Sequence, residues 1–308
     1  MNASVCAIGL DVGGTKIAAG LVSPDGKVLT KRVIPTLPER GGKAVLEDAL
    51  ALAESLQQEA TAAGRNVSAV GIGVAELVDV EGNVTSAQTI PWRGLPVQER
   101  FARLAPAVVE ADSRAAAFCE GKFGAGRGCR VFLYVTIGTG IGSSLVLDGV
   151  PFSGARGRSG TLASSPLTTH CTGCGAVLHP VLEELASGPA LVTRYNRLAN
   201  TRVVKAEEVL AAAAAGDSHA IRVIETASDA LGATIGLMIN MLDPEAIVVG
   251  GGLGTAGGLY GDRFVTSTRQ HIWSDTHRDL PIVTAACGSE AGFVGAAALA
   301  LQRCPVAS

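Results

Sequence analysis

The sequence is poor in charged residues and has no long apolar run. Charged side chains make up only 17% of its 308 residues, and the formal net charge at pH 7 is −3. Proteins that bind nucleic acid usually carry a clustered excess of Lys and Arg, so we expect no nucleic-acid partner. A membrane span needs about 18 consecutive apolar residues, and the alanine run at 211–215 is far shorter. We therefore expect no membrane association either.

We also expect neither an export signal nor a paired cysteine framework. The first four residues lead directly into a predicted strand, without the basic and apolar segments of a secretory leader. The cysteines number seven, which is odd, and most of them are scattered along the chain. This usage is typical of free thiols in a reducing compartment, and it predicts a cytoplasmic protein. A chain of this length can form two domains, each with its own core.

Two similar glycine-rich segments stand out, one near the N-terminus and one about a domain later. The first reads Asp11-Val12-Gly13-Gly14-Thr15-Lys16, and the second reads Gly138-Thr139-Gly140-Ile141-Gly142. Each lies between two apolar, β-branched runs, which predicts a strand, a glycine turn and a second strand. Backbone N–H groups and hydroxyls in two such turns can bind a polyphosphate from both sides. The pair predicts a phosphotransferase that closes two domains on ATP; ordinary hairpin turns are the alternative.

The remaining pattern alternates strands and helices. Residues 27–33 are predicted as a third strand after a Ser-Pro-Asp-Gly turn, and residues 43–63 have helical apolar spacing. The other predicted strands are 67–74, 107–110, 247–249 and 282–285, and the other predicted helices are 113–123, 181–185, 189–198, 205–214, 218–242 and 291–302. Repeated β-hairpins with interleaved helices predict an α/β fold of two similar halves. We expect domains at 1–110 and 111–290, with the final helix, about 291–304, packing back on the first.

The motifs, taken in order, resemble those of the ROK family (repressors, open reading frames, kinases) of sugar kinases. They are the first glycine turn, Gly71-Ile72-Gly73, Glu110-Ala111-Asp112, the second glycine turn, Glu183 with Ala186-Ser187-Gly188, and Asp243-Pro244-Glu245 with Gly250-Gly251-Gly252. The resemblance covers nearly the whole chain. It implies the actin-like, hexokinase-like ATPase fold, with two RNase H-like domains and the active site in a central cleft. It also implies ATP, Mg²⁺, a hexose phosphorylated usually at its 6-hydroxyl, and a homodimer.

The resemblance assigns the ATP side of the site to the glycine segments and their neighbours. The implied ATP-binding residues are Asp11, Gly13, Gly14, Thr15, Lys16, Gly138, Thr139, Gly140, Gly142, Gly250, Gly251 and Gly252. The glycines would let the backbone approach the phosphates, and Asp11 would hold Mg²⁺ through water. The triple glycine would leave room for the adenosine, with a purely structural turn as the alternative.

Asp112 is the predicted catalytic base. It follows a buried strand and precedes a helix, where a carboxylate can accept the proton of an attacking hydroxyl. Its position also fits a helix N-cap, which aspartate favours. The resemblance implies that Asp112 and Glu183 bind the sugar, and a solvated helix face is the alternative for Glu183.

Three positions depart from the family's sugar-binding pattern. Ala111 stands where the family has Asn, and Thr161 and Ser164 stand where the Glu and His of a Glu-x-Gly-His motif would fall. Each lost partner for a buried hydroxyl costs about 1–3 kcal/mol. We therefore predict that Thr161 and Ser164 help to bind a different acceptor, an amino sugar such as kanosamine or a sugar-like cyclitol. The alternatives are an ordinary glucokinase, an N-acetylmannosamine kinase, and a non-catalytic sugar-binding protein.

The cysteine loop also differs from the family's zinc motif, because Val181 occupies the place of its third cysteine. Cys171 and Cys174 are spaced as Cys-x-x-Cys, with His170 and His179 close by. Four such N/S ligands can form a tetrahedral Zn²⁺ site. Adjacent His170 and Cys171 rarely both ligate one ion without strain, so a metal-free loop with two thiols is an equal alternative.

Overall fold

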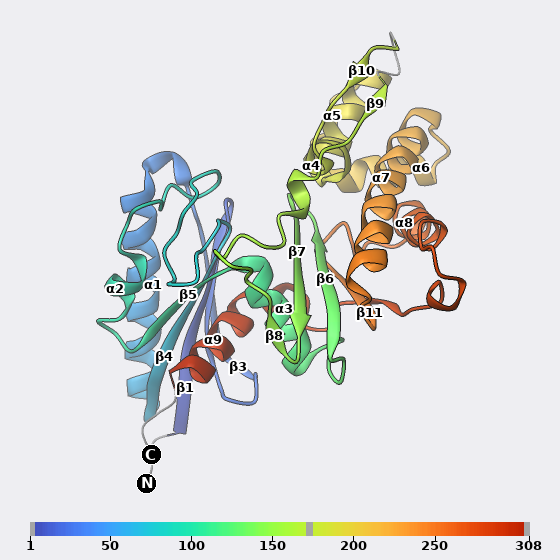
Figure 1. The fold of residues 1–308 in the computed structure, drawn as a ribbon. Coiled ribbons are helices and arrows are strands. Elements are labelled where there is room, and N and C mark those ends of the chain that lie inside the picture. The colour runs from blue at the N-terminus through green and yellow to red at the C-terminus, as the bar shows by residue number, and fades with distance from the viewer. Residues whose placement is uncertain (1–3, 171–174, 305–308) are drawn as a thin grey trace. The chain divides into compact units, whose positions relative to one another are not determined.

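The computed structural model describes residues 4–170 and 175–304 (Figure 1). By their internal contacts, these residues form two compact units. The first comprises the chain up to Cys129, Ser144–Ser159 and the chain from Ala286 onward, and the second comprises Arg130–Ser143 and Gly160–Ala285. The domain boundary near residue 110 stays a prediction.

The sheet of the first unit has the strand order β3-β2-β1-β4-β5. Its strands are β1 (Ser4–Val12), β2 (Lys16–Val22), β3 (Val28–Pro35), β4 (Arg65–Val74) and β5 (Ala107–Ala111). Strands β1, β2 and β3 pair antiparallel, whereas β4 and β5 run parallel to β1. The hairpin predicted around the first glycine turn is confirmed, with Val12 opposite Ile17.

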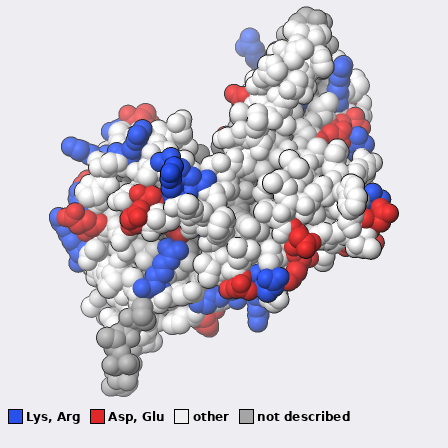
Figure 2. All heavy atoms as spheres, viewed as in Figure 1, with Lys and Arg blue, Asp and Glu red and all other residues white. Residues whose placement is uncertain are grey.

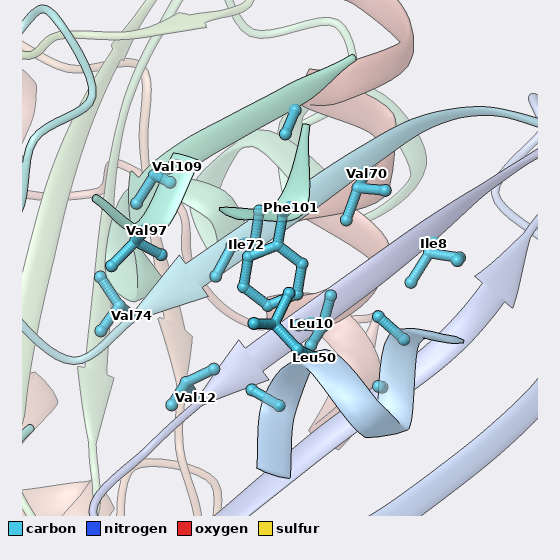
Figure 3. Packing of buried hydrophobic residues seen from close by; sticks show 14 of the residues in the cluster. Ile8, Leu10, Val12, Leu50, Val70, Ile72, Val74, Val97, Phe101 and Val109 are labelled. Atoms are coloured by element: carbon cyan, nitrogen blue, oxygen red, sulfur yellow. The ribbon is translucent and has the colours of Figure 1, made fainter. Parts of the chain in front are cut away.

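The main core of this unit lies on one face of the sheet. The helices of the unit are α1 (Gly42–Ala62), α2 (Val97–Phe101), α3 (Asp112–Phe123) and α9 (Ala291–Arg303). Because side chains alternate along a strand, Ile8 and Leu10 of β1 project toward the same side. There they join a buried cluster that includes Leu50 of α1 and Phe101 of α2 (Figure 3). The buried residues of α1 recur at three- and four-residue spacing, as an amphipathic helix requires.

The opposite face carries a row of glycines beneath α9. Gly20, Gly9 and Gly71 are register partners on the adjacent strands β2, β1 and β4. A Cβ atom at Gly9 would lie 1.9 Å from the carbonyl oxygen of Phe293, and one at Gly71 would lie 1.9 Å from that of Ala296. A side chain at Gly9 or Gly71 would therefore push α9 away, and glycine lets the helix backbone lie directly on these two strands.

The second unit contains a parallel group of strands and the helices α4 to α8. Its strands are β6 (Val131–Ile137), β11 (Ala246–Gly250), β12 (Ile282–Thr284) and the short pair β9 (Thr169–His170) and β10 (Val177–Leu178). Strand β7 (Ile141–Leu147) begins in this unit and ends in the first, where it pairs with β8 (Val150–Pro151). The helices are α4 (Leu182–Ala186), α5 (Gly188–Ala199), α6 (Ala206–Ala214), α7 (Ser218–Leu242) and α8 (Gly258–Gln270). Strand residues such as Leu133 and Ile247 pack in one cluster with α7.

Most of the predicted elements are confirmed, but α8 was not predicted. The helices expected at 43–63, 113–123 and 218–242 correspond to α1, α3 and α7. Helix α8 holds two glycines and several Ser, Thr and Val residues, all of which lower helix propensity. Its buried residues, Tyr260, Phe264, Ser267 and Thr268, nevertheless recur at helical spacing, and the helix packs against α7. Tertiary packing outweighs propensity here.

Within residues 4–170 and 175–304, no helix combines the length and the apolar character that crossing a bilayer requires. On the face drawn in Figure 2, acidic and basic side chains are interspersed among a majority of uncharged residues. This distribution reflects the low charge content of the sequence.

Replacing Gly71 with Ala should destabilise the first unit by about 1–3 kcal/mol, because the new Cβ overlaps the backbone of α9. Urea unfolding followed by the fluorescence of the buried Trp92 would measure the loss. Gly261→Ala in α8 is the matched control, since no neighbouring atom lies within 4 Å of its Cβ position. That variant should be unchanged or more stable, by about 0.5–1 kcal/mol. A fully stable Gly71→Ala protein would contradict the close packing of α9.

Candidate active site

Asp112 is the first residue of α3 and follows directly after β5. Ala111 has the extended backbone of the N-cap position, so Asp112 is not the capping residue. Its Oδ1 atom accepts a hydrogen bond from the N–H of the next residue, Ser113, at 2.6 Å. The interpretation of Asp112 as a helix N-cap is therefore wrong, because the helix begins at Asp112 rather than after it.

Three carboxylates of the first unit lie close enough to affect one another. Burial, together with the negative charges of Asp11 and Glu76, raises the pKa of Asp112 to about 7. The hydrogen bond from Ser113 and the positive charge of Arg114 oppose that shift. Burial also raises the pKa of Asp11 to about 6, against a smaller effect of Lys16. A carboxylate with a pKa near 7 is well matched to accepting a proton at neutral pH.

The first glycine turn closes the β1–β2 hairpin next to Asp11. The Gly13 N–H donates to the Lys16 carbonyl at 3.1 Å, and the Thr36 hydroxyl donates to the Gly13 carbonyl at 2.5 Å. The side chains of Thr15 and Lys16 are exposed, so they are accessible to a ligand. The turn itself is thus held by its own hydrogen bonds while its two donor side chains face solvent.

Glu76 is a buried carboxylate that the sequence pattern did not single out. It follows β4 and is only 7% exposed. One of its oxygens accepts hydrogen bonds from the Ser86 hydroxyl and the Gln88 N–H, and the other accepts from two N–H groups at residues 89–90. The methyl group of Thr89 would lie 2.6 Å from a Cβ atom at Gly14. Glu76 therefore holds this loop against the first glycine turn.

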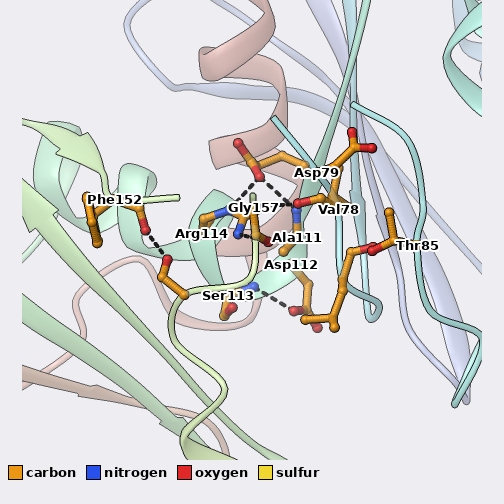
Figure 4. A network of polar contacts seen from close by, with 12 residues as sticks. Val78, Asp79, Thr85, Ala111, Asp112, Ser113, Arg114, Phe152 and Gly157 are labelled. Carbon is orange, nitrogen blue, oxygen red and sulfur yellow. Dashed lines mark hydrogen bonds and ion pairs between the residues drawn. The ribbon is translucent and has the colours of Figure 1, made fainter. Parts of the chain in front are cut away.

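Arg114 is a second buried charge in this unit, also missed by the sequence pattern. It is 2% exposed, and its Nε atom forms an ion pair with Glu110 at 2.6 Å. Its Nη1 and Nη2 atoms donate to the carbonyl oxygens of Gly157 and Val78, at 2.9 and 2.8 Å. Figure 4 shows the guanidinium group among these segments, near Asp112. Glu110 also accepts a hydrogen bond from Arg303 of α9 at 3.0 Å.

In the second unit, the second glycine turn meets Glu183. The Gly138 N–H donates to the Gly140 carbonyl at 2.9 Å, and the Gly188 N–H donates to the Gly138 carbonyl at 2.8 Å. Glu183 of α4 accepts the N–H of Ile141 at 2.7 Å through its Oε2 atom. Glu183 is half-buried against the turn, which differs from a freely solvated helix face.

A pocket of about 580 Å³ opens beside this turn, within the second unit. Its walls include Gly138 and Thr139 of the turn, Gly252 after β11, and Lys205, Ala206 and Leu210 at the start of α6. Its volume lies in the range of small-molecule sites, and its walls are mostly apolar with a few polar groups. The structure thus brings residues of the second glycine turn and the triple glycine together around one pocket.

The predicted acceptor residues Thr161 and Ser164 lie on one short turn. The turn spans Leu162–Ser164, and the Ser164 N–H donates to the Thr161 carbonyl at 3.1 Å. Both side chains are exposed. The structure therefore brings these two positions together on an accessible part of the second unit.

The predicted zinc ligands are described only in part, since Cys171 and Cys174 lie outside the described residues. His170 and His179 are both exposed. His170 is paired with Val177 in the β9–β10 ladder, and the Nδ1 atom of His179 lies 3.4 Å from the Thr168 hydroxyl. Among the residues that the structure describes, no three His, Cys, Asp or Glu side chains come together as a metal site.

Comparison with known protein families gives a match over nearly the whole chain. The model of the ROK family matches residues 7–303. The chain belongs to the ROK family. It is similar to a glucokinase of Streptomyces coelicolor, with 33% identity over 97% of this chain and 98% of the relative. It is also similar to a kanosamine kinase of Amycolatopsis mediterranei, with 30% identity over 95% of each chain.

A solved structure agrees with this assignment. The ROK family glucokinase of Streptomyces griseus, in complex with glucose and AMPPNP, is 31% identical and covers 96% of this chain and 99% of its own, with a TM-score of 0.81. The expected α/β fold is thereby confirmed: this ROK protein has the actin-like, hexokinase-like ATPase fold. The roles of individual site residues stay predictions.

Asp112→Asn should make this ROK protein more stable at alkaline pH. The pKa of Asp112 rises from 3.8 to about 7 on folding, so the native protein keeps a proton that the unfolded chain releases. Stability from the neutral carboxyl is therefore present at low pH and is lost as the pH rises through this window. At about pH 8 the variant should gain on the order of 1–3 kcal/mol, allowing for partial exposure to water.

Urea unfolding of both proteins at several pH values would measure that gain. Asp279→Asn is the matched control, because the side chain of Asp279 is fully exposed. A gain that is equal at low and high pH would contradict a raised pKa of Asp112.

Proposed function

We propose that this ROK protein transfers the γ-phosphoryl group of ATP to a primary, 6-type hydroxyl of an amino sugar or a sugar-like cyclitol, with Asp112 as general base. That it is an ATP-dependent sugar kinase follows from its family and from its glucokinase relatives. The acceptor and the base are the proposal. The observation that carries the base is the place of Asp112, half-buried at the start of α3 directly after β5, where burial and the negative charges of Asp11 and Glu76 raise its pKa.

Asp112 would act as the general base of the phosphoryl transfer. Its ionised carboxylate would accept the proton of the acceptor hydroxyl while the bond to the leaving ADP oxygen breaks in line. A weaker base would leave the proton on the hydroxyl, and a stronger one would itself be protonated at neutral pH. The remaining task of the protein is to position the acceptor and to stabilise the charge on the phosphoryl group.

Asp11 and the first glycine turn fit Mg²⁺ and phosphate. Carboxylate oxygens are hard donors of the kind that Mg²⁺ prefers, usually with water retained between. The raised pKa of Asp11 follows from burial that Lys16 only partly offsets, so a cation would find an unbalanced negative charge there. Bound Mg²⁺ supplies neutralisation of the phosphate charge that develops during transfer. Thr15 and Lys16 would add hydrogen bonds from their exposed side chains.

The pocket of the second unit fits the nucleotide. Thr139 would donate its hydroxyl and N–H group to a phosphate, as polar groups at such a turn do. The apolar walls around Ala206 and Leu210 suit a flat base, and Gly252 leaves the entrance open. ATP is therefore the proposed occupant.

An amino sugar is favoured among the acceptors. With Asp11 assigned to Mg²⁺, Glu76 and the ionised Asp112 would still stabilise a nearby ammonium group. Thr161 and Ser164 offer hydroxyls where a glucose-binding motif would offer Glu and His. The similarity to a kanosamine kinase supports the same choice. Glu183, held at the second glycine turn, remains a proposed contact to the acceptor.

Two further expectations remain proposals. Zinc at His170, Cys171, Cys174 and His179 would be tested by metal analysis of the purified protein. A homodimer would be tested by light scattering, and the strongly exposed apolar side chains of Met241 and Trp273 give it a candidate surface.

A coupled assay of ADP release should detect turnover on one or more members of an acceptor panel. The panel is glucose, mannose, fructose, N-acetylmannosamine, N-acetylglucosamine, glucosamine, kanosamine and C7-cyclitols. We expect the highest kcat/KM on an amino sugar or a cyclitol, and Asp112→Asn should lower kcat by about 10²–10⁴-fold. Asp279→Asn should leave it unchanged. Binding of ATP without turnover on any member would favour the alternative of a non-catalytic sugar-binding protein. Full activity of Asp112→Asn would exclude Asp112 as the base.

Gly252→Leu should raise the KM for ATP by about tenfold or more, equivalent to about 1.4 kcal/mol of binding. The Cβ position of Gly252 has no neighbour within 4 Å, so the fold tolerates the side chain while the pocket becomes occupied. The KM for the acceptor should not change. Gly261→Leu, also open but away from the pocket, is the control. An unchanged KM for ATP would place the nucleotide elsewhere.

A further inference from the structure

Arg114 joins three stretches of the first unit that are far apart in the sequence. Through Glu110 it is tied to the end of β5, through Val78 to the turn after β4, and through Gly157 to the segment after β8. Each of its three nitrogen atoms has a partner within 2.9 Å. Arginine suits this place because its planar fork donates in fixed directions and does not lose its charge.

The segment around Gly157 packs directly against the turn after β4. Gly157 has a φ of +71°, and a Cβ atom there would lie 2.1 Å from the Val78 carbonyl oxygen. Two backbones thus meet directly, and the guanidinium group of Arg114 donates to both. Along the chain, this segment leads within a few residues to Thr161 and Ser164.

Asp112 is carried by the same turn of backbone as the two residues of this ion pair. It lies between Glu110 and Arg114 in the sequence, so the buried ion pair of those two residues spans the start of α3. Arg303 donates to the second oxygen of Glu110 and so ties α9 to the same pair. A shift of the guanidinium group would move the start of α3, and Asp112 with it.

We propose that Arg114 is a positioning residue of the phosphoryl transfer, which fixes Asp112 by binding the Gly157 and Val78 backbones to the Glu110 carboxylate. The proposal rests on the proposed role of Asp112 as base. Arg114 does not touch the acceptor itself. It acts through the place of Asp112, and its charge acts on Asp112 alongside the other charges nearby. Those are Asp11 of β1 and Glu76 after β4, with Glu110 and Arg303 around Arg114 itself.

Arg114→Lys and Arg114→Gln separate the two effects. Lysine keeps the charge but cannot bridge three acceptors, so kcat should fall about 10–100-fold while the KM for ATP stays within about twofold. The acid limb of the kcat/KM profile should stay in place. Glutamine removes the charge as well, so the pKa of Asp112 should rise and the acid limb should move to higher pH. Arg100→Lys, at an exposed ion pair with Glu47 in the same unit, should be neutral.

Two further measurements protect the test against simple misfolding. Arg114→Ala should regain several-fold activity in millimolar guanidinium ion, which can fill the vacated site, but not in methylammonium. Gly157→Ala, which leaves Arg114 and Asp112 unchanged, should lower kcat with the same small effect on the KM for ATP. A folded Arg114→Lys variant with the kcat of the wild type would overturn the proposal. So would a loss of activity that is fully explained by a smaller fraction of folded protein.

The anchoring can also be measured without turnover. Amide hydrogen exchange at residues 153–159 and 78–82 should accelerate in Arg114→Gln, while exchange in α7 stays constant. The carboxyl ¹³C titration of Asp112, assigned with Asp112→Asn, should move to higher pH in the same variant. If both changes occur but the wild type phosphorylates no acceptor, the proposed function fails and the anchoring stands. If neither occurs, the proposal for Arg114 fails whatever the activity.

Discussion

The contact between the backbone of α9 and the glycines of β1 and β4, Gly9 and Gly71, is the constraint on which the first unit depends. Helix and sheet normally stand apart by the thickness of their side chains, and here that layer is missing. α9 also touches the backbone of α3, since a Cβ at Gly295 would lie 1.8 Å from the Ala115 carbonyl oxygen. Helix α9 therefore fixes the position of β1, which carries Asp11, and of α3, which carries Asp112.

The chemistry of this unit depends on charges placed where water is scarce. Glu76 and the pair of Glu110 and Arg114 are buried, and each is satisfied by hydrogen bonds from its own surroundings. Such groups add little to stability, because desolvation offsets most of the attraction between charges. These groups instead fix the positions of the segments around them, and Glu76 and Arg114 change the proton affinity of Asp112. The poorly compensated carboxyls of Asp11 and Asp112 are costly to the fold, which is typical of a site shaped for a reaction.

Sequence reasoning succeeded where the signal was local. The first glycine turn lies between two strands whose pattern is unambiguous, and the ordered motifs were enough to predict the family and its fold. Glu76 and Arg114 were missed because their partners are remote: Arg114 meets carbonyl groups 36 and 43 residues away. Helix α8 was missed because its glycines and β-branched residues mask a pattern that only packing on α7 reveals. Asp112 fitted the N-cap position by its sequence, but the structure makes it the first residue of α3.

The first unit is assembled from three separate stretches of chain, and the last of them contains α9. During synthesis, the ribosome must finish the whole of the second unit before α9 emerges. Until then, the glycine row of β2, β1 and β4 has no side chains of its own to shield the sheet from water. A nascent chain that stops short of Ala291 would thus expose an open sheet face, and α9, made after the second unit, is the helix that closes it.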